Sequence, residues 1–182
     1  MIAAGEIIGG VYGAWRLARR DPAGLIWFDA SHRGFWHSFW GPALVLPGFL
    51  VLQTLDGAFA ESVLAALTVH LIAYVIGCVA FPLAVAHVAE GLQRSHVYTR
   101  YIVAYNWSAV VQMAVLLPVA ILVQLFPQFA ILNLALTMGL LVYQAYVAHV
   151  ALEVTPTAAA LLVLLDLLIA AMVQMSADRL LI

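Results

Sequence analysis

The sequence is poor in charge. Only 9% of its 182 residues are charged, and lysine is absent, so that all seven basic residues are arginines. Soluble domains carry about 25% charged residues. Because 66% of the residues are hydrophobic and the mean hydropathy is +1.06, a water-soluble globule of this length could not bury its apolar surface. The composition predicts an integral membrane protein whose first partner is the lipid bilayer.

Cysteine is scarce, and a basic excess and enzyme motifs are missing. Cys78 is the single cysteine, so no disulfide can form within the chain, and we interpret it as a packing residue. A net charge of −2 is not typical of a protein that binds nucleic acid, which needs a basic surface. The sequence contains no phosphate loop, nucleophile elbow, HExxH or CxxC motif. We therefore expect a protein that is not an enzyme and has no cofactor.

Apolar runs define the expected fold, because a helix needs about 20 mostly apolar residues to cross a bilayer. The sequence predicts an all-α bundle of five transmembrane helices in residues 35–182. The predicted spans are 35–53, 62–88, 101–124, 129–151 and 157–176.

Arginine positions predict the orientation of the bundle. Arg179 is alone on its side of the membrane, whereas the other six arginines precede the first span or join the second to the third. By the positive-inside rule the N-terminus is cytoplasmic and the C-terminus periplasmic, in a bacterial inner membrane. The six arginines on the cytoplasmic side are Arg16, Arg19, Arg20, Arg33, Arg94 and Arg100.

Residues 1–34 are expected to form a separate cytoplasmic element. Ile7, Ile8, Val11 and Trp15 recur at helical spacing, which is typical of an amphipathic helix lying in the headgroup region. Pro22 ends this helix. Tryptophan favours the membrane interface, so an aromatic anchor is predicted here, with a docking patch for a soluble partner as the alternative. The anchor residues are Trp15, Trp27, Trp36 and Trp40.

An internal repeat is suggested by two self-matches. The pentapeptide VAHVA occurs at 85–89 and at 147–151, a shift of 62 residues. A shift of 71 residues places 36–53 over 107–124 with a common frame of Trp, Pro and Gln. Both shifts pair spans that run in the same direction. We hypothesise a parallel two-hairpin repeat to which a fifth helix is added.

Asp166 is the clearest functional candidate, because an ionisable side chain in the middle of a span is costly. It must be protonated or paired, and the candidate partners at its depth are His70, then Gln112 and Gln144. It either links helices by hydrogen bonds or binds a proton or cation. Asn106 and Asn133 are interpreted as interhelical hydrogen bonders.

The VAHVA histidines are each followed by a glutamate on the same helical face. His87 with Glu90 and His149 with Glu153 would offer two imidazoles and two carboxylates, a set suited to zinc, manganese or iron. Proton sensing is a second hypothesis. The simpler interpretation is interfacial polarity, since histidine near a helix C-terminus is favoured by the helix dipole.

The stretch WRLARRDPAGLIWFDASHRGFWHSFW, the five spans and RYIVAYNWSAVVQ together resemble uncharacterised inner-membrane proteins of proteobacteria. The arrangement is also similar to the Yip family of five-span membrane proteins. That resemblance implies a compact bundle with a cytoplasmic N-terminus, and it brings no catalytic residues.

The function expected from the sequence is a non-enzymatic scaffold or accessory subunit of a larger inner-membrane complex, bound to other membrane subunits or to itself as an oligomer. The alternative is a small transporter or channel subunit with a proton- or cation-linked site at Asp166. A scaffold should hold Asp166 in a dry contact, whereas a transporter should place it beside a cavity.

Overall fold

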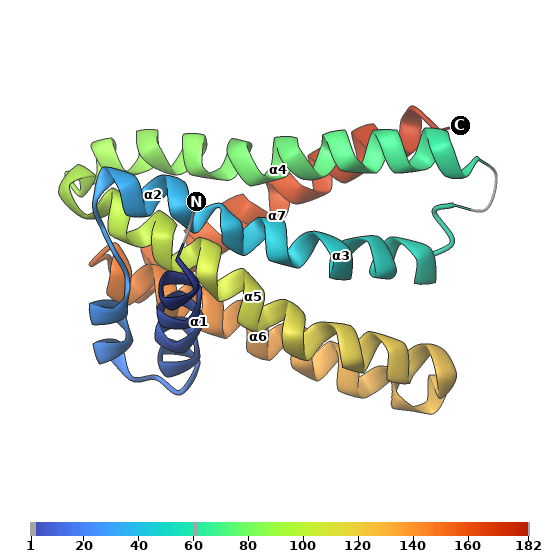
Figure 1. Cartoon of the computed structure of the whole chain (residues 1–182), viewed down its shortest axis with the longest axis horizontal. Helices are drawn as coiled ribbons and strands as arrows, with labels where there is room; N and C mark the ends of the chain where they lie inside the picture. Colours follow the sequence, from blue (N-terminus) through green and yellow to red (C-terminus); the bar gives the residue numbers. More distant parts are fainter. Residues whose placement is uncertain (1–2, 60–61, 182) are drawn as a thin grey trace.

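The computed structural model describes residues 3–59 and 62–181, and within these ranges it is helical without any strand (Figure 1). The elements are α1 (Ala4–Ala18), η1 (Pro22–Trp27), α2 (His32–Ser38), α3 (Trp40–Leu55), α4 (Val63–Gly91), α5 (Ser95–Leu125), η2 (Pro127–Phe129), α6 (Ala130–Ala151) and α7 (Pro156–Arg179).

Five helical segments are long and apolar enough to cross a membrane, which confirms the five predicted spans. The third differs most, because α5 begins at Ser95 rather than at residue 101. The prediction began where the apolar run begins, but a helix continues into water as long as its backbone bonds are made. The segments are His32–Leu55, Val63–Gly91, Ser95–Leu125, Pro127–Ala151 and Pro156–Arg179.

The first span is interrupted between α2 and α3, and Pro42 explains where. Proline has no N–H, so Pro42 cannot donate to the carbonyl of Ser38, four residues earlier. α2 ends at Ser38, and α3 restarts with Pro42 in its first turn, where proline is tolerated. Ser31 caps α2 by accepting a hydrogen bond from Gly34 N at 3.1 Å.

Helix α5 is the centre of the bundle. It contacts α1, α2, α3, α4 and α6, while α7 packs against α4 and α6. α3, α5 and α7 run in one direction and α4 and α6 in the other (Figure 1). With 31 residues α5 is about 46 Å long, which exceeds the roughly 30 Å of a hydrocarbon core. A helix of this length crosses a bilayer only by tilting or by extending beyond it.

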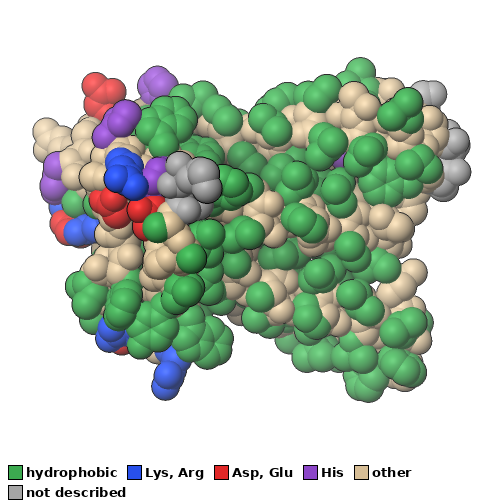
Figure 2. Space-filling model, in the orientation of Figure 1, with side chains coloured by type: hydrophobic (Ala, Val, Ile, Leu, Met, Phe, Trp, Pro, Cys, Tyr) green, Lys and Arg blue, Asp and Glu red, His purple; other side chains and the backbone are tan. Residues whose placement is uncertain are grey.

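Charge is concentrated at the end of the bundle where α5 and α7 begin and α4 and α6 finish (Figure 2). We call it the arginine-rich end. Four arginine–carboxylate pairs cover it, namely Arg16 with Asp21, Arg33 with Glu6, and both Arg94 and Arg100 with Glu153. The opposite end carries Asp56, Asp178 and Arg179 among the described residues.

Helix α1 lies crosswise to the long helices (Figure 1) and is fastened to them through glycine. A Cβ on Gly10 would overlap the ring of Trp107 in α5. A Cβ on Gly13 would lie 2.8 Å from the carbonyl oxygen of Gly24 in η1. The Tyr143 hydroxyl of α6 donates to the carbonyl of Ala14 at 2.8 Å. Glycines that weaken an isolated helix are here the points of closest approach.

Residues 3–34, expected from the sequence as a separate cytoplasmic element, pack onto the bundle. Ala14 and Leu17 are fully buried and Phe28 is nearly so, and all three belong to the same core as α5 and α6. The reason is the small-residue face of α1, which the apolar spacing alone does not distinguish from a face for lipid.

Candidate functional site

Asp166 lies near the middle of α7, where α5, α6 and α7 meet. Its Oδ2 accepts a hydrogen bond from Nε2 of Gln144 in α6. The hydroxyl of Tyr105 in α5 lies 3.1 Å from both carboxylate oxygens. The sequence ranks His70 first as a partner, which is wrong, and includes Gln144, which is correct. One carboxylate thus connects three helices.

Tyr105 is held in place by other aromatic rings. Its ring centroid lies 4.7 Å from that of Phe81 in α4 and 6.2 Å from that of Tyr101, one turn earlier on α5. Phe81 and Tyr101 are each 1% exposed, so they restrict the Tyr105 ring from two sides. The hydroxyl is consequently directed at Asp166 by packing.

A cavity of about 310 Å³ lies beside this carboxylate, between α3, α4, α5 and α7. Its wall is mostly apolar, and Asp166 is its ionisable carboxylate. Polar side chains in the wall include Tyr105, Asn106 and Gln174. The remaining lining residues are Pro42, Val45, Phe49, Ala73, Tyr74, Gly77, Cys78, Ala109, Ile169, Ala170 and Val173. Cys78, interpreted from the sequence as a packing residue, is half-buried in this wall.

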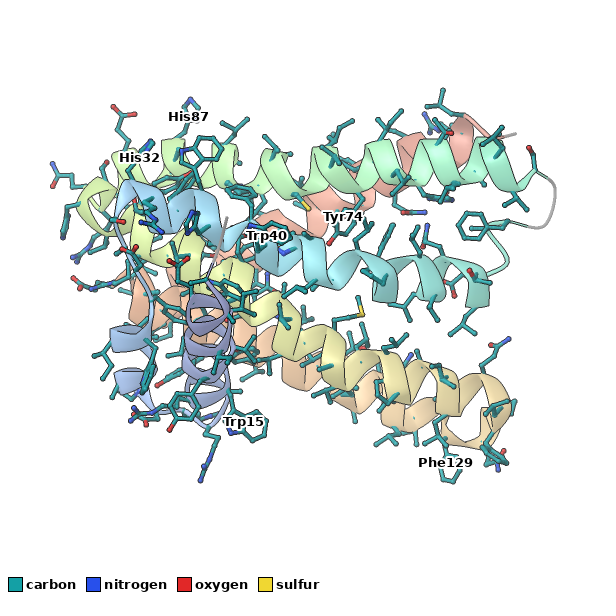
Figure 3. All side chains as sticks on the ribbon, viewed as in Figure 1. Trp15, His32, Trp40, Tyr74, His87 and Phe129 are labelled. Carbon is teal, nitrogen blue, oxygen red and sulfur yellow. The ribbon has the colours of Figure 1, made fainter. Side chains whose placement is uncertain are left out.

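The α3–α4 side of the cavity is formed by side chains. The rings of Phe49 and Tyr74 lie 4.8 Å apart, and the Tyr74 hydroxyl donates to the carbonyl of Pro42 at 2.6 Å (Figure 3). We call Phe49 and Tyr74 the ring seam. The backbones of these two helices pack closely against α5 and α7 instead.

The charge of Asp166 has no basic partner within residues 3–59 and 62–181, where every ion pair lies at the arginine-rich end. Tyr105 and Gln144 are neutral donors that orient the carboxylate without neutralising it. A carboxylate in an apolar region is neutralised by a proton or by a cation. The cavity provides the space from which either can arrive.

His70 lies nearer the opposite end, away from Asp166. It is 1% exposed, and its Nδ1 lies 2.7 Å from Nε2 of Gln53 in α3. Its Nε2 is buried and has no hydrogen-bond partner among the described residues. His70 is thus a link between α3 and α4, and Gln53 is a partner that the sequence does not identify.

The other polar candidates differ in role. Asn106 donates to Ser38 Oγ at 2.9 Å, which confirms an interhelical hydrogen bond, here between α5 and α2. Gln112 is half-buried on α5 and takes no part in the hydrogen bonds of Asp166. The Oδ1 of Asn133 is buried and accepts no hydrogen bond in the described ranges, so the expected interhelical bond is not made through that atom.

The four proposed metal ligands are not brought together. His87 points out of the bundle and pairs with the carbonyl of Leu83 in its own helix (Figure 3). The Nδ1 of His149 lies 2.5 Å from the carbonyl oxygen of Val154, and Glu90 is exposed. No cluster of three or more His, Cys, Asp or Glu side chains that could hold a metal ion occurs in the part of the chain that the structure describes.

Glu153 forms ion pairs with arginines at the arginine-rich end instead of binding a metal with the histidines. It accepts a hydrogen bond from Arg100 Nη2 at 2.6 Å, with Arg94 Nη1 at 3.5 Å. The hydrogen bond from Arg100 lowers the pKa of Glu153. Arg100 Nε also donates to the carbonyl of Ala151 at 3.0 Å, which satisfies the end of α6. With a φ of 56°, Glu153 is in the left-handed region and is held there by these bonds.

The tryptophans separate into two groups. Trp107 is 4% exposed and packs beneath α1. The four residues predicted as anchors, Trp15, Trp27, Trp36 and Trp40, are all about half exposed. Figure 3 shows Trp15 on the outer side of α1. Tyr12 meets Trp27 edge to face at 4.7 Å, so α1 and η1 share one exposed aromatic surface.

Comparison with known proteins adds no relative. No protein-family model, no curated protein and no solved structure matches this chain.

Proposed function

We propose that this chain is a small, non-enzymatic transport protein of the bacterial inner membrane, in which Asp166 binds a proton or a cation from the adjoining cavity. The observation that supports the proposal is an intramembrane carboxylate that faces a cavity of about 310 Å³ and has only neutral hydrogen-bond partners. An ionisable side chain inside the membrane favours a functional role, because placing its charge there costs free energy.

The proposed orientation places the arginine-rich end in the cytoplasm and the C-terminus in the periplasm. Six of the seven arginines support it through the positive-inside rule. In this orientation α1 lies along the cytoplasmic surface of the membrane. Its exposed face carries Ile8, Tyr12 and Trp15 at helical spacing, and its buried face is fixed to the bundle. α1 is thus proposed as an interfacial helix that contacts lipid and bundle on different faces.

The parallel repeat is proposed on similar grounds. Phe81 and Tyr143 are both buried, as are Val85 with Val147 and Ala89 with Ala151. The Trp frame behaves differently, since Trp36 is exposed where Trp107 is buried. The two VAHVA helices, α4 and α6, therefore present equivalent residues to one core. This supports a repeat of the second span in the fourth more than a repeat of the first span in the third.

The proposed function is tested by the titration of Asp166 itself. Purified protein in lipid nanodiscs is moved between acidic and alkaline buffer, and the carboxyl C=O stretch is followed by infrared difference spectroscopy. A band from a poorly hydrated carboxyl group is expected in the wild type and in Asp178→Asn, a matched control on the same helix at the exposed end. Asp166→Asn should lack it. A wild-type spectrum without any band attributable to Asp166 contradicts proton binding, and if the cation probe described below also fails to bind, the proposed function is wrong.

A second function, that of a scaffold or accessory subunit, is favoured by a different feature. An apolar groove of about 330 Å³ lies between α4 and α7 on the outer surface, lined by residues such as Ile72, Ile76 and Met172. Another membrane subunit or a second copy of the chain could place a helix there. Native mass spectrometry from nanodiscs distinguishes this function, because a scaffold should copurify in a defined stoichiometric complex.

A further inference from the structure

The cavity beside Asp166 has an aromatic wall on three of its helices. Phe49 comes from α3, Tyr74 from α4 and Tyr105 from α5. The carboxylate comes from α7, so four helices contribute one group each. Aromatic faces attract cations through the quadrupole of the ring, and Asp166 attracts them through its charge. Cation–aromatic attraction is strongest where water is excluded, and most of this wall is apolar.

The hydrogen bonds of Asp166 restrict the kind of cation. Both carboxylate oxygens already face the Tyr105 hydroxyl, and one also accepts from Gln144. A small metal ion would need several more oxygen ligands at close range, and no metal-binding cluster exists among the described residues. A quaternary ammonium needs no hydrogen bond, since its charge is spread over methyl groups. It can be neutralised while the two donors stay in place.

The size of the cavity agrees with such a ligand. Its volume of about 310 Å³ lies at the lower limit of ligand pockets, which are about 300–1,000 Å³. Apolar residues such as Val45, Ile169 and Val173 would cover the hydrocarbon part. We infer that this cavity binds a small hydrophobic organic monocation of the aromatic or alkyl ammonium class. This inference rests on the proposed function, in that it names the cation which Asp166 receives.

The experiment uses benzyltrimethylammonium as the probe and neopentylbenzene as its matched neutral control, in which a carbon replaces the charged nitrogen. Binding to the full chain in nanodiscs is measured by saturation-transfer NMR and calorimetry. We expect saturable binding of the cation and at least about tenfold weaker binding of the neutral isostere. Asp166→Asn should lower the affinity for the cation by a similar factor and leave the affinity for the isostere unchanged. Asp56→Asn, an exposed carboxylate outside the cavity, is the matched control.

Position in the cavity is tested with Tyr74→Phe and Tyr74→Leu. Phenylalanine keeps the ring and removes only the hydroxyl, so the cation should still bind. Leucine removes the ring, so it should lower the affinity for the cation. Circular dichroism and size-exclusion profiles establish that each variant is folded. Equal affinity for the cation and its isostere, or unchanged binding to folded Asp166→Asn, would overturn the inference.

The outcomes separate this inference from the proposed function. If Asp166 titrates in the infrared spectrum but benzyltrimethylammonium does not bind, the ligand class is wrong while proton binding stands. If the cation binds but Asp166 shows no titration, proton linkage is wrong and the cavity is a cation site alone.

Discussion

The Cα of Gly10 lies directly against the indole ring of Trp107, so close that a methyl group on Gly10 would occupy the position of the ring. This contact fixes α1 across the bundle, against α5. The most buried tryptophan of the chain is therefore covered by a residue that has no side chain.

Replacing Gly10 with alanine should loosen α1. The added methyl group must displace Trp107 or lift the helix, at a cost of about 1–3 kcal/mol in the free energy of unfolding. Thermal unfolding in detergent, with tryptophan fluorescence as a second signal, measures the effect. Gly5→Ala is the matched control, since no atom lies within 4 Å of a Cβ there, and it should leave stability unchanged or raised. Equal stability of the two variants would show that α1 is not docked in this way.

Gln53→Leu should destabilise the α3–α4 pair. Nε2 of Gln53 lies 2.7 Å from Nδ1 of His70, whose other nitrogen is already buried without a partner. The loss would leave the imidazole with no bond, at a cost of about 1–3 kcal/mol. Thermal unfolding of Gln53→Leu, His70→Leu and the double variant forms a thermodynamic cycle. If the double variant is as unstable as the sum of the single changes, the two residues are not coupled.

Glu153 should make stability depend on acidity. Its pKa is lowered in the folded state by Arg100, so its contribution is fully present above the unfolded value of about 4.5 and is lost as pH falls through the lower folded value. The stability difference between wild type and Glu153→Gln should be constant from neutral pH to about pH 5. Below that it should shrink. Unfolding curves at several pH values measure it, and a difference that grows in acid would contradict the assignment.

Single-cysteine labelling tests the orientation. In a Cys78→Ala background, cysteine at position 20 should react with a membrane-impermeant maleimide only after the cells are opened. Cysteine at position 179 should react in intact cells. Both arginines are exposed, so accessibility within the fold does not limit either reaction. The reverse labelling pattern would place the arginine-rich end in the periplasm.

The sequence predicts the spans well because a bilayer requires long apolar runs, and it identifies Asp166 because charge stands out in such a run. It does not predict the partners reliably. The direction of a side chain turns by about 100° with each residue along a helix, so the limits of a span do not fix which neighbour a side chain contacts. His70 lies nearer the opposite end of the bundle and contacts Gln53 in α3, whereas Gln144 contacts Asp166 in α7. Tyr105 is missed because a tyrosine near a span end indicates an interface, and only packing against Phe81 turns its hydroxyl towards the carboxylate.

The ring seam of Phe49 and Tyr74 has a kinetic consequence. Where the backbones of two helices pack closely, the wall between them changes shape only if the helices move, which takes microseconds to milliseconds. Rotamer changes of side chains are far faster, on the order of picoseconds to nanoseconds when they are exposed. At this wall the contacts between α3 and α4 are the ring contact of Phe49 with Tyr74 and the hydroxyl bond from Tyr74 to Pro42, so its shape depends on side-chain rotamers more than on the positions of the helices.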